Sequence, residues 1–262
     1  NRIARWNFNQ NGLSITAPAP SEGSGSASLL GLSGATPSSI AAGSFTDPAQ
    51  AAGSINNGFS TANYPAASVS NKTAGIQFNV STVGQKNIML TWEQRHSNTG
   101  SKYARLQYSA DGFTATTNDA QVITMGATNN SFVFYSADLS AITTINDNAN
   151  FAFRIVTEFE STATGSGSAS YLGTAGTYGT GGTIRYDLLS VYGNTVTVAP
   201  ASQYLAAAPS STNVVLTWTN AAYYLRASTV VSNGYVTIPG ATSPYTVPAS
   251  NNFRFFRLSD TP

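Results

Sequence analysis

Hydrophobic and polar residues alternate with a period of two along much of the chain, and the alternating segments are short. Valine, isoleucine, threonine, tyrosine and phenylalanine dominate these segments, while clusters of glycine, asparagine, serine and proline separate them. Because successive side chains of a strand point to opposite faces, this pattern predicts β-strands. No segment has the spacing of three and four residues, with caps, that a long helix requires. The chain is therefore predicted to be all-β.

The clearest predicted strands lie before residue 196. They are residues 3–8, 75–80, 87–95, 103–109, 132–136, 151–159 and 183–192. Residues 96–102 are predicted to be the loop of a hairpin, because strands flank them on both sides. Residues 11–72 are rich in serine, glycine, alanine and proline, and we expect them to wrap the sheets as irregular edge strands and loops. Residues 161–182 are expected to form a mobile or ligand-binding loop.

A second, smaller block follows a predicted hinge at Ala199 and Pro200. Its five predicted strands are residues 214–218, 223–228, 235–238, 243–247 and 253–258. The expected domains are therefore residues 1–196 and 197–262. A domain of about 60 residues is marginal as an isolated fold, so we expect it to dock on the first domain or on another copy.

Charge is sparse, and this excludes several classes of protein. Charged residues make up 9% of the chain, against about 25% in an ordinary soluble domain, and the formal net charge is +1. The absence of cysteine excludes disulfides and thiol chemistry. The small net charge argues against a nucleic-acid partner, and the apolar runs are too short to span a bilayer. With so little charge repulsion, self-association is physically easy.

Several segments resemble secreted bacterial β-proteins. Residues 182–193, with Asp187 between aliphatic neighbours, resemble the closing strand of jelly-roll carbohydrate-binding modules. Residues 92–98 and 106–112 are similar to an uncharacterised extracellular bacterial family. Residues 216–218, 224–229, 238–245 and 255–258 resemble small fibronectin- or immunoglobulin-like modules. The resemblance implies a jelly-roll β-sandwich followed by a smaller β-sandwich, in a secreted or cell-surface protein. The start at Asn1 is read as a mature chain after leader removal, or as one trimmed for expression.

Alternation also predicts a polar cluster on the faces of the central strands. If those strands are neighbours, the cluster contains Glu93, Arg95, Tyr103, Arg105, Gln107, Arg154 and Glu158. Arginine, glutamine and glutamate can hydrogen-bond neighbouring sugar hydroxyls, and the Tyr103 ring can stack on a sugar. The same residues can instead form a cross-strand lattice of ion pairs that only stabilises the sheet. Both interpretations are open at this stage.

Catalysis is not expected. The pairs Glu158–Glu160 and Glu93–Glu158 could reach the spacing that a glycosidase needs, which is about 5–10 Å. However, nearby arginines would hold these carboxylates ionised, and a general acid must be protonated. The single histidine, His96, has no second histidine or cysteine to help it bind a metal, so an ordinary hydrogen bond is expected.

Other aromatic and acidic residues have two interpretations each. Tyr171 and Tyr178 could form a sugar-binding surface, or they could belong to a long surface loop that binds no ligand. Trp6, Trp92 and Trp218 lie inside strand patterns and are expected in the core. Asp187 could join a structural calcium site, with carbonyls near residues 7 and 9, although no Asp-rich loop is present.

These observations lead to two hypotheses for function. The first is a non-catalytic extracellular structural or adhesive protein that self-assembles into a filament or surface matrix, with glycan contact as a secondary role. Residues 1–8 could add as a strand to a neighbour's sheet, which would propagate such an assembly. The alternative is a carbohydrate-binding module of a secreted polysaccharide-active system.

Overall fold

The chain divides into two compact units, Asn1–Val196 and Thr197–Pro262, which are described separately. The computed structural model describes residues 1–126, 131–196, 204–249 and 254–261. The predicted hinge at Ala199 and Pro200, and residue 253 of the last predicted strand, lie outside these ranges. Within these ranges, no helix is long and apolar enough to cross a membrane.

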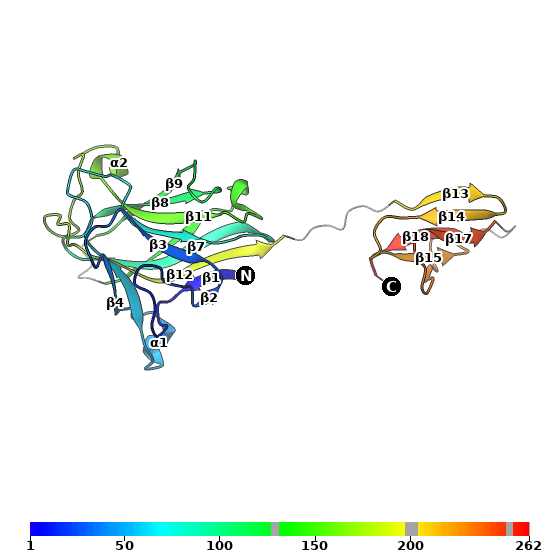
Figure 1. The fold of residues 1–262 in the computed structure, drawn as a ribbon, viewed down its shortest axis with the longest axis horizontal. Coiled ribbons are helices and arrows are strands. Elements are labelled where there is room, and N and C mark those ends of the chain that lie inside the picture. The colour runs from blue at the N-terminus through cyan, green and yellow to red at the C-terminus, as the bar shows by residue number, and fades with distance from the viewer. Residues whose placement is uncertain (127–130, 197–203, 250–253, 262) are drawn as a thin grey trace. The chain divides into compact units, whose positions relative to one another are not determined.

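Two antiparallel sheets form the larger unit (Figure 1). The seven-stranded sheet has the order β10-β7-β12-β1-β2, and β5 joins β12 to β4. Its strands are β1 (Arg2–Trp6), β2 (Glu22–Gly23), β4 (Ser38–Ala42), β5 (Asn57–Thr61), β7 (Gln85–His96), β10 (Val133–Asp138) and β12 (Ile184–Thr195). The first strand of the unit therefore lies beside the last one.

The five-stranded sheet has the order β3-β6-β11-β8-β9. Its strands are β3 (Ser26–Leu30), β6 (Gly75–Asn79), β8 (Tyr103–Ser109), β9 (Asn118–Thr124) and β11 (Ala152–Glu158). The helical elements are short: α1 (Pro48–Ala51), α2 (Glu160–Thr164) and the 3-10 turn η1 (Thr143–Ile145). The chain passes repeatedly between the two sheets, which confirms the predicted all-β jelly-roll sandwich.

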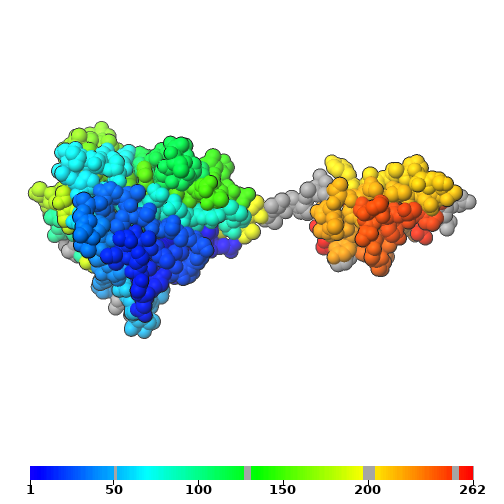
Figure 2. All heavy atoms as spheres, in the orientation of Figure 1, coloured from blue at the N-terminus to red at the C-terminus, as the bar shows by residue number. Residues whose placement is uncertain are grey.

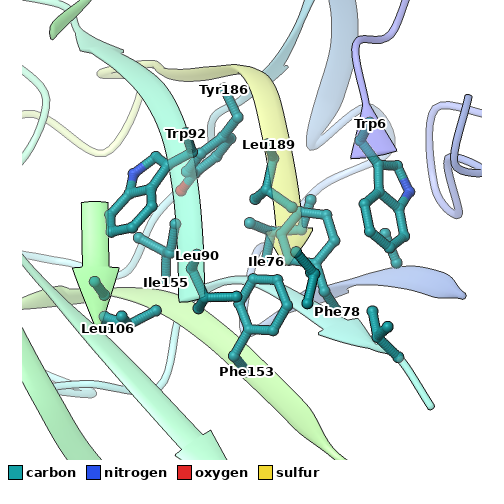
Figure 3. Close-up of a cluster of buried hydrophobic side chains, with 14 of the residues drawn as sticks. Trp6, Ile76, Phe78, Leu90, Trp92, Leu106, Phe153, Ile155, Tyr186 and Leu189 are labelled. Carbon is teal, nitrogen blue, oxygen red and sulfur yellow. The ribbon is translucent and has the colours of Figure 1, made fainter. Parts of the chain in front are cut away.

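The core fills the space between the two sheets (Figure 3). Trp6, Leu90, Trp92, Tyr186 and Leu189 from the seven-stranded sheet point toward Ile76, Phe78, Leu106, Phe153 and Ile155 from the other sheet. Phe78 stacks on Phe153 at 5.1 Å between ring centroids and meets the edge of Trp6 at 4.9 Å. The tryptophans of the larger unit are therefore core residues, as their strand patterns predicted.

One prediction about strand partners is wrong. β7 and β8 do not form a hairpin, because β7 pairs with β10 and β12 whereas β8 pairs with β9 and β11. Residues 97–102 instead cross from one sheet to the other. Backbone hydrogen bonds hold this crossing: Ser97 N donates to Thr183 O, and Lys102 N donates to Leu172 O. Alternation defines the two faces of a strand but not the strand beside it.

The segment 11–72 wraps the sheets as expected. It contributes the short strands β2, β3, β4 and β5, of which β2, β3 and β4 lie at the ends of their sheets. In Figure 2 this part of the chain, coloured from blue to cyan, covers much of the visible face of the larger unit. The loop between β4 and β5, residues 43–56, reaches over the outer face of the seven-stranded sheet, and its contacts are described below.

The smaller unit consists of two three-stranded sheets. One sheet contains β13 (Ala206–Ser210), β14 (Asn213–Thr217) and β17 (Tyr245–Pro248), and the other β15 (Tyr224–Ser228), β16 (Val236–Thr237) and β18 (Phe255–Ser259). Leu216, Trp218, Leu225 and Val247 form its small core, so Trp218 is also a core residue. The alanine-rich strand β13 was not predicted, because it contains no β-branched or aromatic residue.

Candidate functional site

The predicted polar cluster is divided between the two outer faces of the sandwich. Tyr103, Arg105, Gln107, Arg154 and Glu158 lie on the five-stranded sheet, whereas Glu93 and Arg95 lie on the seven-stranded sheet. The expectation that all seven residues gather on one surface is therefore wrong. Its physical cause is the pairing of β7 with β12 instead of β8.

A network of ion pairs occupies the outer face of the five-stranded sheet. The Glu158 side chain is fully buried and accepts two hydrogen bonds from Arg105, 2.9 Å from Nε and 2.7 Å from Nη2. Lys72 Nζ lies 3.3 Å from the same carboxylate. This two-point geometry is the strong form of the arginine–carboxylate pair.

Asp119 extends this network onto the neighbouring strand β9. Its carboxylate accepts hydrogen bonds from Lys72 Nζ at 2.6 Å and from Gln107 Nε2 at 2.7 Å. Burial works to raise the pKa of Asp119, but the hydrogen bonds from Lys72 and Gln107 outweigh it and hold the pKa below its usual value. The carboxylate is therefore ionised at neutral pH and engaged by Lys72 and Gln107.

Arg154 and Tyr103 complete this face. Arg154 Nε donates to Gln107 Oε1 at 2.8 Å, and its guanidinium lies 4.2 Å from the centre of the Phe113 ring. Tyr103 is only 7% exposed, so little of its ring is free for stacking. The outer face of the five-stranded sheet thus has the geometry of a stabilising lattice, the second of the two interpretations of the sequence.

The outer face of the seven-stranded sheet carries two carboxylates opposite each other. Glu93 of β7 pairs in register with Asp187 of β12, and the 43–47 loop lies over them. Asp187 is fully buried and accepts hydrogen bonds from the backbone N–H groups of Ser44 and Leu188, both at 2.7 Å. Thr46 Oγ1 donates to Glu93. The loop is therefore fixed to the sheet on both sides of Phe45.

Burial raises the pKa of Asp187 to about 7, although its two backbone hydrogen bonds favour the ionised form. The neighbouring carboxylates of Asp47 and Glu93 raise it further. Gly43 is required at the edge of this cluster, because a Cβ at that position would lie 2.6 Å from Asp187 Oδ2.

The calcium expectation does not fit the surroundings of Asp187. Backbone N–H groups point at both of its carboxylate oxygens, and such donors would oppose a cation at the same oxygens. Across the described ranges, no group of three histidine, cysteine, aspartate or glutamate residues could hold a metal ion. We therefore assign Asp187 the role of anchoring the 43–47 loop.

A pocket of about 240 Å³ lies on one side of this loop. We call it the Arg95 pocket, and its lining residues are Ala42, Gly43, Phe45, Arg95, Ser131, Phe132 and Arg185. Arg95 and Arg185 are directly opposite each other on β7 and β12. Neither arginine has an acidic side chain within 4.0 Å among the described residues, and no hydrogen-bond partner is present for either buried Nε atom.

A second pocket of about 180 Å³ lies on the same outer face. We call it the Arg5 pocket, and its lining residues are Arg2, Arg5, Thr91, Trp92, Glu93, Phe134, Leu188, Ser190 and Tyr192. Here the arginines are paired, since Glu22 lies 2.5 Å from Arg2 Nη1 and 3.3 Å from Arg5 Nη1. Phe134, at its rim, is 62% exposed.

The carboxylates of the two pairs considered for catalysis do not share one face of a sheet. Glu160 begins α2 instead of sharing a strand face with Glu158, and its carboxylate accepts a hydrogen bond from Ser168 N at 2.8 Å. Glu93 and Glu158 lie on different sheets. Asp187 does face Glu93, but it is fully buried and cannot reach a bound substrate.

The single histidine and the two loop tyrosines have structural contacts. His96 ends β7 and is buried, with its Nδ1 hydrogen-bonded to Ser101 O, and burial lowers its pKa to about 4. Tyr171 is 2% exposed and packs against Phe159 at 4.7 Å between ring centroids. Tyr178 donates to Pro65 O at 2.7 Å. These contacts hold residues 161–182 against the sandwich.

Sequence reasoning missed Arg185, Phe45 and Phe132, which line the Arg95 pocket. Arg185 and Arg95 each stand two residues from an acidic residue on their own strand, which is the only signal present in the sequence. That signal becomes informative only when the register of β7 and β12 is known. Phe45 belongs to the loop after β4.

No protein-family model matches this sequence, and no curated protein matches it. Among solved structures, the chain is similar to the CBM22-1 and GH10 modules of Clostridium thermocellum endo-1,4-beta-D-xylanase 10B, complexed with xylohexaose. The TM-score is 0.36 and the identity 13%, and the match covers 63% of this chain but only 26% of that one.

Two further structures show comparable similarity. The CBM22-2 xylan-binding domain of Paenibacillus barcinonensis Xyn10C gives a TM-score of 0.38 at 8% identity, covering 73% of this chain and 98% of that one. A cleaved adhesin domain of Lys-gingipain from Porphyromonas gingivalis gives 0.34 at 14% identity, covering 66% and 99%. Similarity at this level assigns neither a family nor a ligand to the chain.

Proposed function

We propose that the chain is a non-catalytic extracellular protein that binds polysaccharide on the outer face of the seven-stranded sheet. The observation that carries this proposal is Phe45, which is 86% exposed although hydrogen bonds fix the residues on both sides of it. A ring held in water on an anchored loop is preorganised for stacking, because little conformational freedom remains to be lost on binding.

The surroundings of Phe45 support a sugar ligand. Both pockets lie on this face, and a phenylalanine is among the lining residues of each, Phe132 in the Arg95 pocket and Phe134 in the Arg5 pocket. Sugar rings present apolar C–H faces and polar edges, so they match a surface that alternates aromatic rings with hydrogen-bonding side chains. The proposal includes no turnover, since Glu93, Glu158 and Glu160 are all engaged in hydrogen bonds.

Affinity gel electrophoresis against a panel of neutral and acidic polysaccharides tests this proposal. We expect at least one polymer to retard the chain, and Phe45→Ala to weaken the retardation. Tyr204→Ala is the matched control, because Tyr204 is an equally exposed aromatic residue, at 83%, in the smaller unit. If no polysaccharide retards the chain, or if the control weakens binding as much as Phe45→Ala, the proposal is wrong.

Self-association is the second candidate function, and the smaller unit favours it. Val230, Val231 and Val236 are 50%, 65% and 70% exposed, and Val236 belongs to β16 at the end of its sheet. An edge strand flanked by exposed apolar residues is suited to pairing with another chain. The expected result is concentration-dependent association in sedimentation and polymers in negative-stain images. A monomer at high concentration would contradict it.

The route to assembly predicted from the sequence needs a correction. Residues 1–8 are not available for addition to a neighbour's sheet, because β1 pairs with β12 on one side and with β2 on the other. The terminal Asn1 is also bound, since its amino group donates to Gly193 O at 2.7 Å. Any assembly of this chain would have to use other edges.

A further inference from the structure

Arg95 and Arg185 form an unusual pair, because two like charges stand directly opposite each other on adjacent strands. Their positions are in register in the pairing of β7 with β12. Side chains in such positions have Cβ atoms about 4.5–5.5 Å apart, and like charges there destabilise a sheet. Burial lowers the pKa of both guanidinium groups, and the charge of Arg185 lowers that of Arg95 further.

The carboxylates nearest along these strands do not compensate the pair. Glu93 and Asp187 are two residues away on the same face. Thr46 and Ser44 of the 43–47 loop donate to them, and Asp187 also accepts a hydrogen bond from the backbone N–H of Leu188. Among the ion pairs of the described residues, none involves either arginine. Arg185 Nη1 donates a long hydrogen bond, 3.4 Å, to Ala42 O.

The two guanidinium groups are only partly exposed, and they line a pocket instead of extending into solvent. Their Nε atoms are buried and have no partner, so each has an N–H group that lacks an acceptor. Phe45 and Phe132 flank them. The pocket volume of about 240 Å³ is smaller than that of sites for drug-sized molecules, about 300–1,000 Å³, which favours one ring or one side group.

We propose that the Arg95 pocket binds the carboxylate of a uronic acid residue in an acidic polysaccharide. This inference rests on the proposed function and specifies its ligand. A carboxylate would supply the negative charge and the acceptors that Arg95 and Arg185 lack, in a charge-assisted geometry that arginine favours. The sugar ring that carries the carboxylate would lie against Phe45, whose ring is exposed beside the pocket.

Polygalacturonate and its fully methyl-esterified form provide a matched pair of ligands, because esterification removes the charge of each carboxyl group and adds only one methyl group. We expect the chain to bind polygalacturonate, to lose that binding at high salt, and to bind the ester at least tenfold more weakly. Arg95→Gln and Arg185→Gln should each weaken polygalacturonate binding at least tenfold. Lys86→Gln, an equal change of charge at the exposed end of β7, should change it less than twofold.

Four results would overturn the inference. The first is equal binding of polygalacturonate and its methyl ester, and the second is unchanged polygalacturonate binding by the two arginine variants. The third is an effect of Lys86→Gln as large as that of Arg95→Gln. The fourth is equal retention of the chain on poly-glutamate, which would exclude a sugar-specific site. If the chain binds a neutral polysaccharide and both arginine variants retain that binding, this inference is overturned and the proposed function stands. Failure to bind any polysaccharide would overturn both. Thermal unfolding of each variant verifies that it is folded.

Discussion

The two outer faces of the larger unit hold arginine side chains in opposite circumstances. On the five-stranded sheet, Arg105 is bound at two points by the fully buried Glu158. On the seven-stranded sheet, Arg95 faces Arg185, and no carboxylate among the described residues pairs with either. Paired charge on the first face is expected to stabilise the fold, whereas the unpaired charge of Arg95 and Arg185 is expected to reduce stability and forms the site that we propose for a ligand.

The carboxylates differ between the two faces in the same way. Hydrogen bonds from Lys72 and Gln107 outweigh burial and lower the pKa of Asp119 on the five-stranded sheet. Burial raises the pKa of Asp187 on the seven-stranded sheet to about 7. Asp119 is therefore expected to titrate only in acid, and Asp187 near neutrality. Four predictions test this contrast.

Glu158→Gln is expected to have the largest effect on stability. It removes the carboxylate that holds Arg105 and Lys72, and leaves the Arg105 side chain, only 13% exposed, without its main partner. Breaking a buried ion pair from one side costs about 3–5 kcal/mol. Denaturant unfolding should show a loss of unfolding free energy in that range.

The matched control for this change is Glu22→Gln, in the exposed pair with Arg2. Exposed ion pairs contribute about 0–1 kcal/mol, so this variant should unfold almost as the parent does. If the two variants lose the same free energy, burial does not distinguish the network on the five-stranded sheet from an ordinary surface pair.

Asp187→Asn is expected to expose a pH dependence that the parent chain conceals. The folded pKa of Asp187, about 7, lies above its usual 3.8, so folding favours the protonated form and stability falls as pH rises between those values. His96 acts in the opposite direction, because its folded pKa of about 4 lies below 6.5, and stability rises with pH between those values. Each contribution is on the order of 3 kcal/mol.

In the parent chain these two effects should nearly cancel between about pH 4 and 6.5. In Asp187→Asn only the His96 contribution remains, so the melting temperature should rise with pH across this interval. Melting curves at half-unit steps of pH measure it, and a double variant that also carries His96→Gln should lose the rise. A parent and a single variant with parallel pH profiles would show that Asp187 is ionised throughout.

Phe45→Ala is expected to separate binding from stability. The ring is 86% exposed, so unfolding free energy should change by less than about 0.5 kcal/mol. Loss of an aromatic stacking contact worth about 0.5–1.5 kcal/mol should weaken polysaccharide binding roughly 2–10-fold. Calorimetric titration and denaturant unfolding measure the two quantities.

Phe113→Ala on the other face provides the inverse case. Its ring supports Arg154 at 4.2 Å, so the substitution should lower stability by about 0.5–1 kcal/mol and leave binding unchanged. If Phe113→Ala weakens binding and Phe45→Ala does not, the ligand lies on the five-stranded sheet.

Local patterns in the sequence were sufficient to predict much of the fold. Residues 103–109 form β8 with the bounds that alternation indicated, and Trp6, Trp92 and Trp218 are buried as expected. Alternation also placed Arg105, Gln107 and Glu158 correctly on outward faces, since burial of Leu106 and Ile155 requires it. These features depend only on residues near each other in the chain.

The partners across strands could not be predicted from the same patterns. Glu93 and Arg105 have equivalent positions in their own strands, yet they lie on different sheets because β7 pairs with β12. The opposition of Arg95 and Arg185 joins residues that lie 90 positions apart in the sequence. Phe45 reaches the pocket only because Ser44 and Thr46 bind carboxylates on two strands. Such contacts follow from register, which no single segment encodes.

Arg95→Gln is expected to have the smallest effect, and its sign is the most informative. Removing one of two like charges that face each other should raise the unfolding free energy by about 0.5 kcal/mol, because no ion pair is lost. Arg105→Gln, the same change on the five-stranded sheet, should instead lower it, since Glu158 would lose its bidentate partner. Denaturant unfolding at low ionic strength gives both values, and added salt should shrink the gain from Arg95→Gln. A loss of stability in both variants would mean that Arg95 contributes to folding, and the contrast between the two faces would no longer hold.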